Sequence, residues 1–263
     1  MKVYKVKSIR PVIKKALLSF PAGFTLPGLL AKLHTMKVLA LETATLAGSV
    51  AVVDDKAGLI GEVRVDVKVA HAERLMNSVD WLLESSGISI NDIDAFAVSI
   101  GPGSFTGLRI GLSTAKGFSY STGKTLVPVP TLDAFARALP FCPHYICPML
   151  DARKNEVYTG LYKWEGKLCR KVIAETAVRP GDFLKEIKWP VVFMGEGAKI
   201  NKKLITDTLG KDAFFAPASS MSPSASGVAG VAIEKLNEGI HTDPVSLRPF
   251  YIRKSEAEVR WKG

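Results

Sequence analysis

The sequence predicts an α/β protein made of two similar lobes, each with three strands followed by alternating helices and strands. Two observations lead to this prediction. After Met36, short apolar runs separated by tight polar turns indicate strands at 37–41, 49–53 and 59–65. Helical and strand-like periods then alternate, and the same order returns in cruder form after Pro140. We therefore expect two duplicated βββαβα lobes, a layered α/β arrangement.

In the first lobe, a helix is expected from His71 because Leu75, Val79 and Leu82 fall on one helical face. The other elements expected here are a strand at 95–100, a helix from 105, a strand at 125–129 and a helix from 131.

In the second lobe, the pattern is less regular. The elements expected are strands at 145–150, 156–162, 168–175 and 191–194, a short helix at 180–188, a helix after residues 195–198, and a last helix that starts within 216–226. The expected division is an extension at 1–35, a first lobe at 36–140 and a second lobe with a tail at 141–263. A cleft between two lobes is the default place for a nucleotide or a substrate.

The extension, residues 1–35, differs in composition from the rest of the chain. It holds seven Lys and Arg, three Pro and no acidic residue, with no sustained period. We expect a start codon assigned too far upstream, with a disordered extension or a targeting sequence as alternatives. A secretory signal is disfavoured because prolines interrupt the apolar run and no cleavage site is evident. No other stretch approaches the roughly 18 apolar residues that a membrane span requires.

The composition, with 47% hydrophobic residues among 263, is that of a protein with an ordinary buried core. The net charge of +10 comes mostly from the extension, because the rest of the chain has 28 basic residues against 25 acidic ones. Bulk charge therefore does not argue for a nucleic acid or a membrane as partner.

Three cysteines, Cys142, Cys147 and Cys169, give an odd count without a C-x-x-C pair, which favours a reduced, cytoplasmic protein. The spacing of Cys142, His144 and Cys147 is a weak zinc half-site. The H-x-E at His71 is a weak deaminase signal, since the Pro-Cys-x-x-Cys partner of that signature is absent. We expect no metal.

The most informative segment is the glycine-rich loop that starts at Gly101 and connects a strand to a helix. Such a loop aims backbone N–H groups at an anion or at another backbone. Glycines then continue at helical spacing through Gly103, Gly107 and Gly111 to Ala115. Each interior glycine costs the helix roughly 1 kcal/mol relative to alanine, so something must pack closely against this stripe. Packing within the chain and a surface for a second chain both remain open.

Three known phosphate or nucleophile loops do not fit this segment. A Walker loop needs Lys-Ser/Thr after its last glycine, but Leu108 and Arg109 follow Gly107. A dinucleotide fingerprint has its third glycine one place earlier and an acidic residue about twenty positions on. A nucleophile elbow needs glycine where Pro102 stands.

Five motifs, in order, resemble the TsaB family, and the resemblance covers essentially Met36 to Glu258. They are Met36-Lys-Val-Leu-Ala-Leu-Glu-Thr-Ala-Thr with Ser49-Val-Ala, His71-Ala-Glu-Arg-Leu, Gly101-Pro-Gly-Ser-Phe-Thr-Gly-Leu-Arg, Asp151-Ala-Arg with Val157-Tyr158, and Leu247-Arg-Pro-Phe-Tyr-Ile-Arg. The resemblance implies the actin-like ATPase and sugar kinase fold, which is RNase H-like. It also implies a scaffold in the bacterial machinery that makes threonylcarbamoyladenosine in tRNA.

The partners implied by the resemblance are the larger paralogue TsaD in a heterodimer, the ATPase TsaE, and a second copy of the chain when TsaD is absent. Contact with tRNA would be indirect, through the complex, and no membrane is involved. No cofactor would bind tightly, and ATP or ADP would have its place at the interface of the complex.

The resemblance also implies that this chain is not catalytic. TsaD binds a metal partly through two histidines four residues apart, and the matching segment here, 130–137, has no histidine and only Asp133 as a carboxylate. Actin-like kinases use Asp-x-Gly turns for close approach to phosphates, and the two turns here lack the glycine. The residues expected in the cleft, in a structural role or with weak nucleotide contact, are Glu42, Thr43, Asp151, Arg153, Gly195 and Gly197.

The implied partner interface lies on the first two helices of the first lobe, 71–84 and 105–120. The residues expected there are His71, Arg74, Leu75, Leu82, Gly103, Phe105, Gly107, Leu108, Arg109, Gly111, Leu112 and Ala115. In this interpretation the glycine stripe admits a partner helix and the leucines fill the seam. Two other functions stay open: an ATP-dependent phosphotransferase of the sugar kinase type with Asp151 as the carboxylate, and a metallopeptidase, for which no paired histidines exist.

Overall fold

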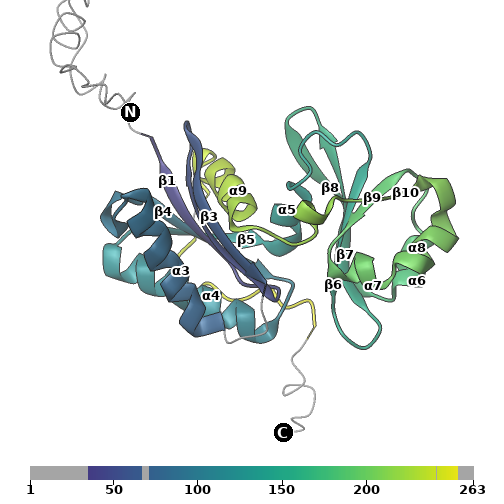
Figure 1. Cartoon of the computed structure of the whole chain (residues 1–263), viewed down its shortest axis with the longest axis horizontal. Helices are drawn as coiled ribbons and strands as arrows, with labels where there is room; N and C mark the ends of the chain where they lie inside the picture. Colours follow the sequence, from purple (N-terminus) through teal and green to yellow (C-terminus); the bar gives the residue numbers. More distant parts are fainter. Residues whose placement is uncertain (1–34, 67–70, 241, 254–263) are drawn as a thin grey trace, which may run out of the picture. The chain divides into compact units, whose positions relative to one another are not determined.

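The computed structural model describes residues 35–66, 71–240 and 242–253. The expectations for residues 1–34 lie outside these ranges. The described part contains two five-stranded sheets (Figure 1). The first sheet holds β1 (Lys37–Glu42), β2 (Ala47–Asp54), β3 (Gly58–Asp66), β4 (Ala95–Gly101) and β5 (Thr125–Pro130). The second holds β6 (Tyr145–Asp151), β7 (Val157–Glu165), β8 (Leu168–Val178), β9 (Val191–Met194) and β10 (Ala213–Phe215).

The helices are divided between the two sheets. They are α3 (His71–Ser86), α4 (Phe105–Thr122), α5 (Thr131–Ala136), α6 (Pro180–Leu184), α7 (Glu196–Ile200), α8 (Lys202–Leu209) and α9 (Ala225–Asn237), with short 3-10 turns at Ile90–Asp92, Gly210–Asp212 and Ala218–Ser220. Within the described ranges, none of these helices has the length and apolar character that crossing a membrane would require.

The two sheets have the same topology. In the first, the order is β3-β2-β1-β4-β5, with β1 antiparallel to β2 and parallel to β4. In the second, the order β8-β7-β6-β9-β10 repeats this arrangement, with β6 antiparallel to β7 and parallel to β9. A tandem repeat of this order is the RNase H-like architecture of actin-like ATPases and sugar kinases. The predicted fold class is therefore confirmed.

The first sheet is covered on both faces (Figure 1). On one face, α3 and α4 pack on the sheet through a core that includes Leu39, Leu75 and Phe96. On the other face, the small apolar side chains of the sheet, such as Ala40 and Ala97, lie against α9. Because strands β1 and β4 are buried on both faces, they read in the sequence as continuous apolar runs.

The placement of α9 corrects the expected division at 140. Although residues 225–237 follow the second sheet in sequence, α9 packs on β1, β2 and β5 of the first sheet. The Ala225 N–H donates to the buried Ser49 Oγ (2.8 Å), which fixes the start of the helix there. Residues 245–251 also return to the first lobe, where the Phe250 N–H donates to the Ile100 carbonyl (2.7 Å). The expected second lobe of 141–263 therefore does not hold for these segments.

The second sheet also separates two cores. Its one face packs on α6, α7 and α8 through residues such as Phe183, Phe193 and Ile205. Its other face packs on α5 through residues such as Phe135 and Ile146. Strand β10, three residues long, was not predicted, because so short a run carries no measurable alternation.

Candidate functional site

The glycine loop folds as its residue types dictate. Strand β4 ends at Gly101, and Ser104 caps the helix after it, its Oγ accepting from the Gly107 N–H (3.2 Å). Serine at this position satisfies one of the N–H groups that have no partner inside the helix. Helix α4 ends at Gly123, which is left-handed (φ +69°), the usual conformation of a glycine cap.

The groups that face the glycine stripe come from the same chain. A Cβ at Gly103 would collide with the Ala44 carbonyl oxygen, one at Gly107 with the Thr43 carbonyl oxygen, and one at Gly111 with Thr43 Oγ1. The contact is also hydrogen-bonded, because Thr43 Oγ1 donates to the Gly107 carbonyl (2.8 Å). The glycines therefore admit the turn between β1 and β2, residues 43–46.

This packing settles the two alternatives for the stripe. Packing within the chain is confirmed, and the expectation that the stripe itself admits a partner helix is wrong. Seven of the twelve residues expected at the interface are buried within the chain's own core: Leu75, Leu82, Gly107, Leu108, Gly111, Leu112 and Ala115. Gly103 is half-buried against Ala44, and the side chain of His71 lies outside the described part.

The outer faces of the same helices carry large apolar side chains that the sequence interpretation missed. Trp81 and Met76 on α3 are 59% and 47% exposed, and Tyr120 on α4 is 70% exposed. Of the expected residues, Arg109 is exposed and Arg74 and Phe105 are half-buried. The helical period of α3 places Met76 and Trp81 away from Leu75 and Leu82, which is the signal that would have identified them.

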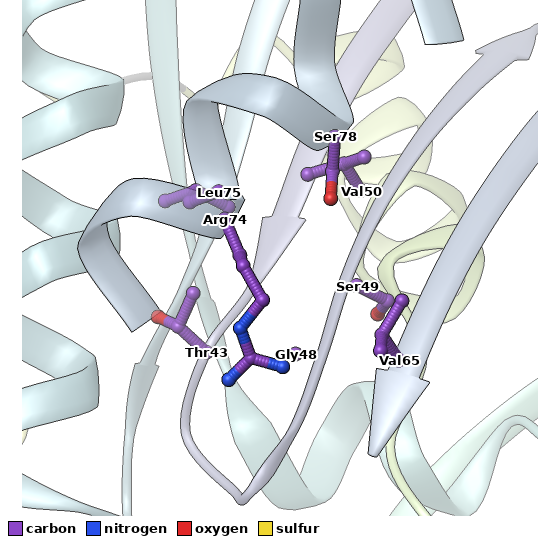
Figure 2. A pocket seen from close by; sticks show the side chains of 8 residues that line it. All are labelled: Thr43, Gly48, Ser49, Val50, Val65, Arg74, Leu75 and Ser78. Atoms are coloured by element: carbon purple, nitrogen blue, oxygen red, sulfur yellow. The ribbon is translucent and has the colours of Figure 1, made fainter. Parts of the chain in front are cut away.

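A small pocket lies beside this turn (Figure 2). Arg74 extends from α3 into it, with the guanidinium between Thr43 and Ser49 and directed at Gly48 (Figure 2). The pocket has a volume of about 30 Å³, which is enough for about one water molecule and far too small for a nucleotide. Arg74 therefore belongs to the packing of α3 on the β1–β2 hairpin.

Glu42 ends β1 and is fully buried. Its Oε1 accepts from the Ala44 N–H (2.6 Å), which shapes the turn that fills the glycine stripe. Burial raises the pKa of Glu42 from 4.5 to about 7, against the effects of the Ala44 N–H, the nearby Ser99 hydroxyl and Arg64. No hydrogen bond of standard geometry to a described residue reaches Glu42 Oε2 or Ser99 Oγ. A carboxylate enclosed in this way is positioned for structure and is closed to a phosphate or a substrate.

The matching turn of the second lobe, between β6 and β7, is open. Asp151 is half-buried and accepts from the Arg153 N–H (2.8 Å), and the Arg153 guanidinium approaches the same carboxylate (3.6 Å). Arg153 therefore holds Asp151, whereas Arg109 stacks over Phe105 (3.9 Å). Arg153 has φ +62°, so an arginine occupies a left-handed position that favours glycine.

The expected cleft residues divide into two groups. Asp151, Arg153 and Gly197 line one cavity of about 870 Å³ in the second lobe, and Gly195 packs on the Met149 carbonyl below it. Glu42 and Thr43 lie in the first lobe, and the lining of this large cavity does not include them. A nucleotide in the cavity would meet Arg153 and Lys154 but also Glu156 and Asp182. The first-lobe turn does not fit a close phosphate approach, because Thr43 and Ala44 fill the space at the glycines.

Segment 130–137, which has no histidine, is held by ion pairs. Asp133 accepts from Tyr162 Oη (2.9 Å) and pairs with Lys171 (2.9 Å), and Arg137 pairs with Glu234 (2.5 Å). Across the described ranges, no group of three His, Cys, Asp or Glu side chains has the arrangement that could hold a metal ion. These residues therefore form a structural network of hydrogen bonds and ion pairs.

Comparison with known proteins gives the family. Residues 58–261 match the family model described as TsaD, tRNA N6-adenosine threonylcarbamoyltransferase. A relative in Bacillus subtilis, called tRNA threonylcarbamoyladenosine biosynthesis protein TsaB, is 32% identical over 86% of this chain and 98% of its own length. A protein of the same name in Haemophilus influenzae is 28% identical over 88% of this chain and 98% of its own.

A solved structure has the same fold. The crystal structure of an uncharacterized protein with similarity to peptidase YEAZ, from Pseudomonas aeruginosa, superimposes with a TM-score of 0.70. It covers 83% of this chain and 100% of its own, at 24% identity. The ordered motifs, the duplicated sheets and the relatives agree. The chain therefore belongs to the TsaB family and shares the TsaD-type domain that the family model describes.

Proposed function

We propose that this chain is a non-catalytic subunit of the complex that makes threonylcarbamoyladenosine in tRNA. The relatives are named for this pathway. The observation that supports the non-catalytic part is the packing of the first turn: Thr43 and Ala44 stand where an active kinase needs glycine for close approach to phosphates, and they fill the glycine stripe of α4 instead. The phosphotransferase alternative is not favoured for this reason, and the described residues give the metallopeptidase alternative no ligand group.

The partner surface in this proposal is the outer face of α3 and α4. Met76 and Trp81 are large, apolar and exposed there, and Leu46 in the adjoining turn is 45% exposed. We infer that these side chains belong to one interaction surface, because contiguous exposed apolar area marks such sites in soluble proteins. The partner is a TsaD-type subunit, with a second copy of this chain taking its place when the chain is alone. TsaE and any ATP or ADP would join at the assembled complex.

Gly117 offers the sharpest test of this surface. It lies on the exposed side of α4, and nothing lies within 4 Å of a Cβ built there. We expect Gly117→Glu to leave the fold intact and to weaken the complex with the TsaD-type subunit at least about tenfold, because a charge would be buried at the seam. Co-purification of the two chains and threonylcarbamoyl transfer to tRNA measure this.

The matched control is Gly230→Glu in α9, where a Cβ also meets nothing within 4 Å. We expect this variant to bind and to support transfer like the unaltered chain. Unaltered binding of the Gly117→Glu variant would remove α4 from the interface. ATP turnover or threonylcarbamoyl transfer by this chain alone would overturn the non-catalytic assignment.

A further inference from the structure

A groove of about 420 Å³ runs between α4 and residues 245–251, which we call the strap. Three cations line it, Arg109, Lys116 and Arg248, and no carboxylate does. The sequence after position 35 is nearly balanced in charge, with 28 basic and 25 acidic residues. The positive charge is therefore concentrated at this place and does not reflect the bulk composition.

The three cations are fixed by neutral groups. Lys116 Nζ donates to the Leu247 carbonyl (2.8 Å), and Arg248 donates to the Val245 carbonyl (2.7 Å). Arg109 Nε donates to the hydroxyl of Tyr251 (3.2 Å). Within the described ranges none of the three forms an ion pair with a carboxylate. Their positions are set while their charge stays uncompensated, which is the state of a preorganised anion site.

One carboxylate lies nearby, that of Asp243. It accepts the N–H groups of Val245 and Ser246 (3.1 and 3.0 Å), so it shapes the start of the strap. These backbone bonds lower the pKa of Asp243, with a smaller effect from Lys116. The carboxylate is committed to the strap and is not among the residues that line the groove.

The positive surface continues along α4. Arg109, Ser113, Lys116 and Tyr120 are spaced by four, three and four residues, so they share one helical face. A second depression, of about 550 Å³, lies at Tyr120 and Lys124; it meets the strap at Val245, and its lining also includes Asp243, so it holds one charge of each sign. From Arg109 to Tyr120 the helical rise gives a stripe of about 16 Å. The occupant is therefore extended and anionic, with room for an aromatic or planar group at the exposed ring of Tyr120.

We propose that this groove and the adjoining stripe of α4 bind the phosphate backbone of the tRNA directly. The inference rests on the proposed function, which supplies the RNA. Cations in a row beside the exposed ring of Tyr120 match an RNA strand, whose phosphates pair with Lys and Arg while a base stacks on an aromatic side chain. An acidic protein segment would satisfy the charges alone, and binding measurements on variants of the groove separate the two occupants.

The test measures binding of fluorescent tRNA to the full chain over a series of KCl concentrations. With three phosphate contacts we expect the logarithm of the binding constant to fall against the logarithm of salt with a slope of about −2. Replacing two cations, Lys116→Gln with Arg248→Gln, should weaken binding about five- to tenfold and remove about two thirds of the slope, roughly 1.4. Because Lys116 also holds the strap, Lys116→Arg is made as well, and it should bind tRNA as the unaltered chain does.

A charge added without removing any contact gives a second, independent variant. Ser113 is exposed and lines the groove, so Ser113→Glu should weaken tRNA binding at least about threefold. Its matched control is Ser219→Glu, also at an exposed serine but in the turn before α9, which should change nothing.

The outcomes separate this inference from the proposed function. If neither Ser113→Glu nor the double variant weakens tRNA binding, the groove is not the tRNA site. Absence of tRNA binding by the unaltered chain also overturns this inference. If Ser113→Glu no longer co-purifies with the TsaD-type partner but binds tRNA as before, the groove binds an acidic protein segment. This result also overturns the RNA proposal. Groove-dependent tRNA binding by a chain that does not co-purify with the TsaD-type subunit keeps the groove and refutes the proposed assembly.

Discussion

The turn after the first strand of each lobe occupies the same place in the duplicated topology, yet the two turns have opposite surroundings. In the first lobe, Thr43 and Ala44 fill the glycine stripe of α4, and Glu42 is completely buried. In the second lobe, Asp151 and Arg153 border an open cavity of about 870 Å³. The comparison teaches that the first turn is part of the core, whereas the second turn borders open space, although neither turn has a glycine at its third position.

The largest expected effect tests whether the first turn is truly sealed. A Cβ at Gly107 collides with the Thr43 carbonyl, whereas at Gly197, beside the second turn, the nearest Met149 and Val157 atoms lie at 3.0 Å. We expect Gly107→Ala to lower the free energy of unfolding by about 3 kcal/mol or more, and Gly197→Ala by about 1 to 2 kcal/mol. Urea denaturation of both variants measures this difference.

The control for this pair is Gly117→Ala, since a Cβ there meets nothing within 4 Å. This variant should gain up to about 1 kcal/mol from helix propensity. If Gly107→Ala were as stable as Gly117→Ala, the first turn would be free to move and the contrast between the lobes would fail.

A second experiment examines the enclosed carboxylate. Burial raises the pKa of Glu42 to about 7, so between pH 4.5 and 7 the folded state holds a proton that the unfolded state releases. The stabilising contribution of the protonated form is complete below about pH 4.5 and is lost as the pH rises through 7. The shift corresponds to roughly 3 kcal/mol at most.

The variant Glu42→Gln removes this titration and keeps the shape of the side chain. Its free energy of unfolding, measured from pH 5 to 8, should fall less steeply with pH than that of the unaltered chain. Parallel profiles would show that Glu42 is not enclosed in solution.

The smallest effect concerns the second turn. Arg153 has φ +62°, a conformation that costs an L-residue about 1 kcal/mol and glycine almost nothing. The free energy of unfolding of Arg153→Gly should therefore exceed that of Arg153→Ala by about 1 kcal/mol. Both variants lose the pairing with Asp151, which contributes little because the arginine side chain is 83% exposed. Equal stability of the two would mean that the turn relaxes away from the left-handed region.

Much of this comparison could be predicted from the sequence. The strands and helices of the first lobe fall within a few residues of their predicted positions, because apolar periods and the serine and glycine caps of α4 are local signals. The stripe at Gly107 and Gly111 could show only that something approaches closely. Whether that group belongs to the same chain or to another is long-range information that glycine spacing does not contain.

The same limit explains the misplaced helix. The apolar face of α9 indicates a buried helix, but nothing in its period tells which of the two sheets it covers. The partner surface was misjudged for a related reason: the leucines of α3 were assigned to a seam with another chain, while their spacing fits the helix face that packs on its own sheet.

The return of α9 to the first sheet has a consequence for how the chain is made. As residues 36–140 leave the ribosome, one face of their sheet, with Val38, Ala40 and Ala97, has no cover, because the helix that packs on it begins only at Ala225. At ordinary rates of synthesis the missing helix emerges roughly 4 to 17 seconds later. The second lobe can complete its own core in that interval, so the two lobes are finished in the reverse of the order in which they are synthesised.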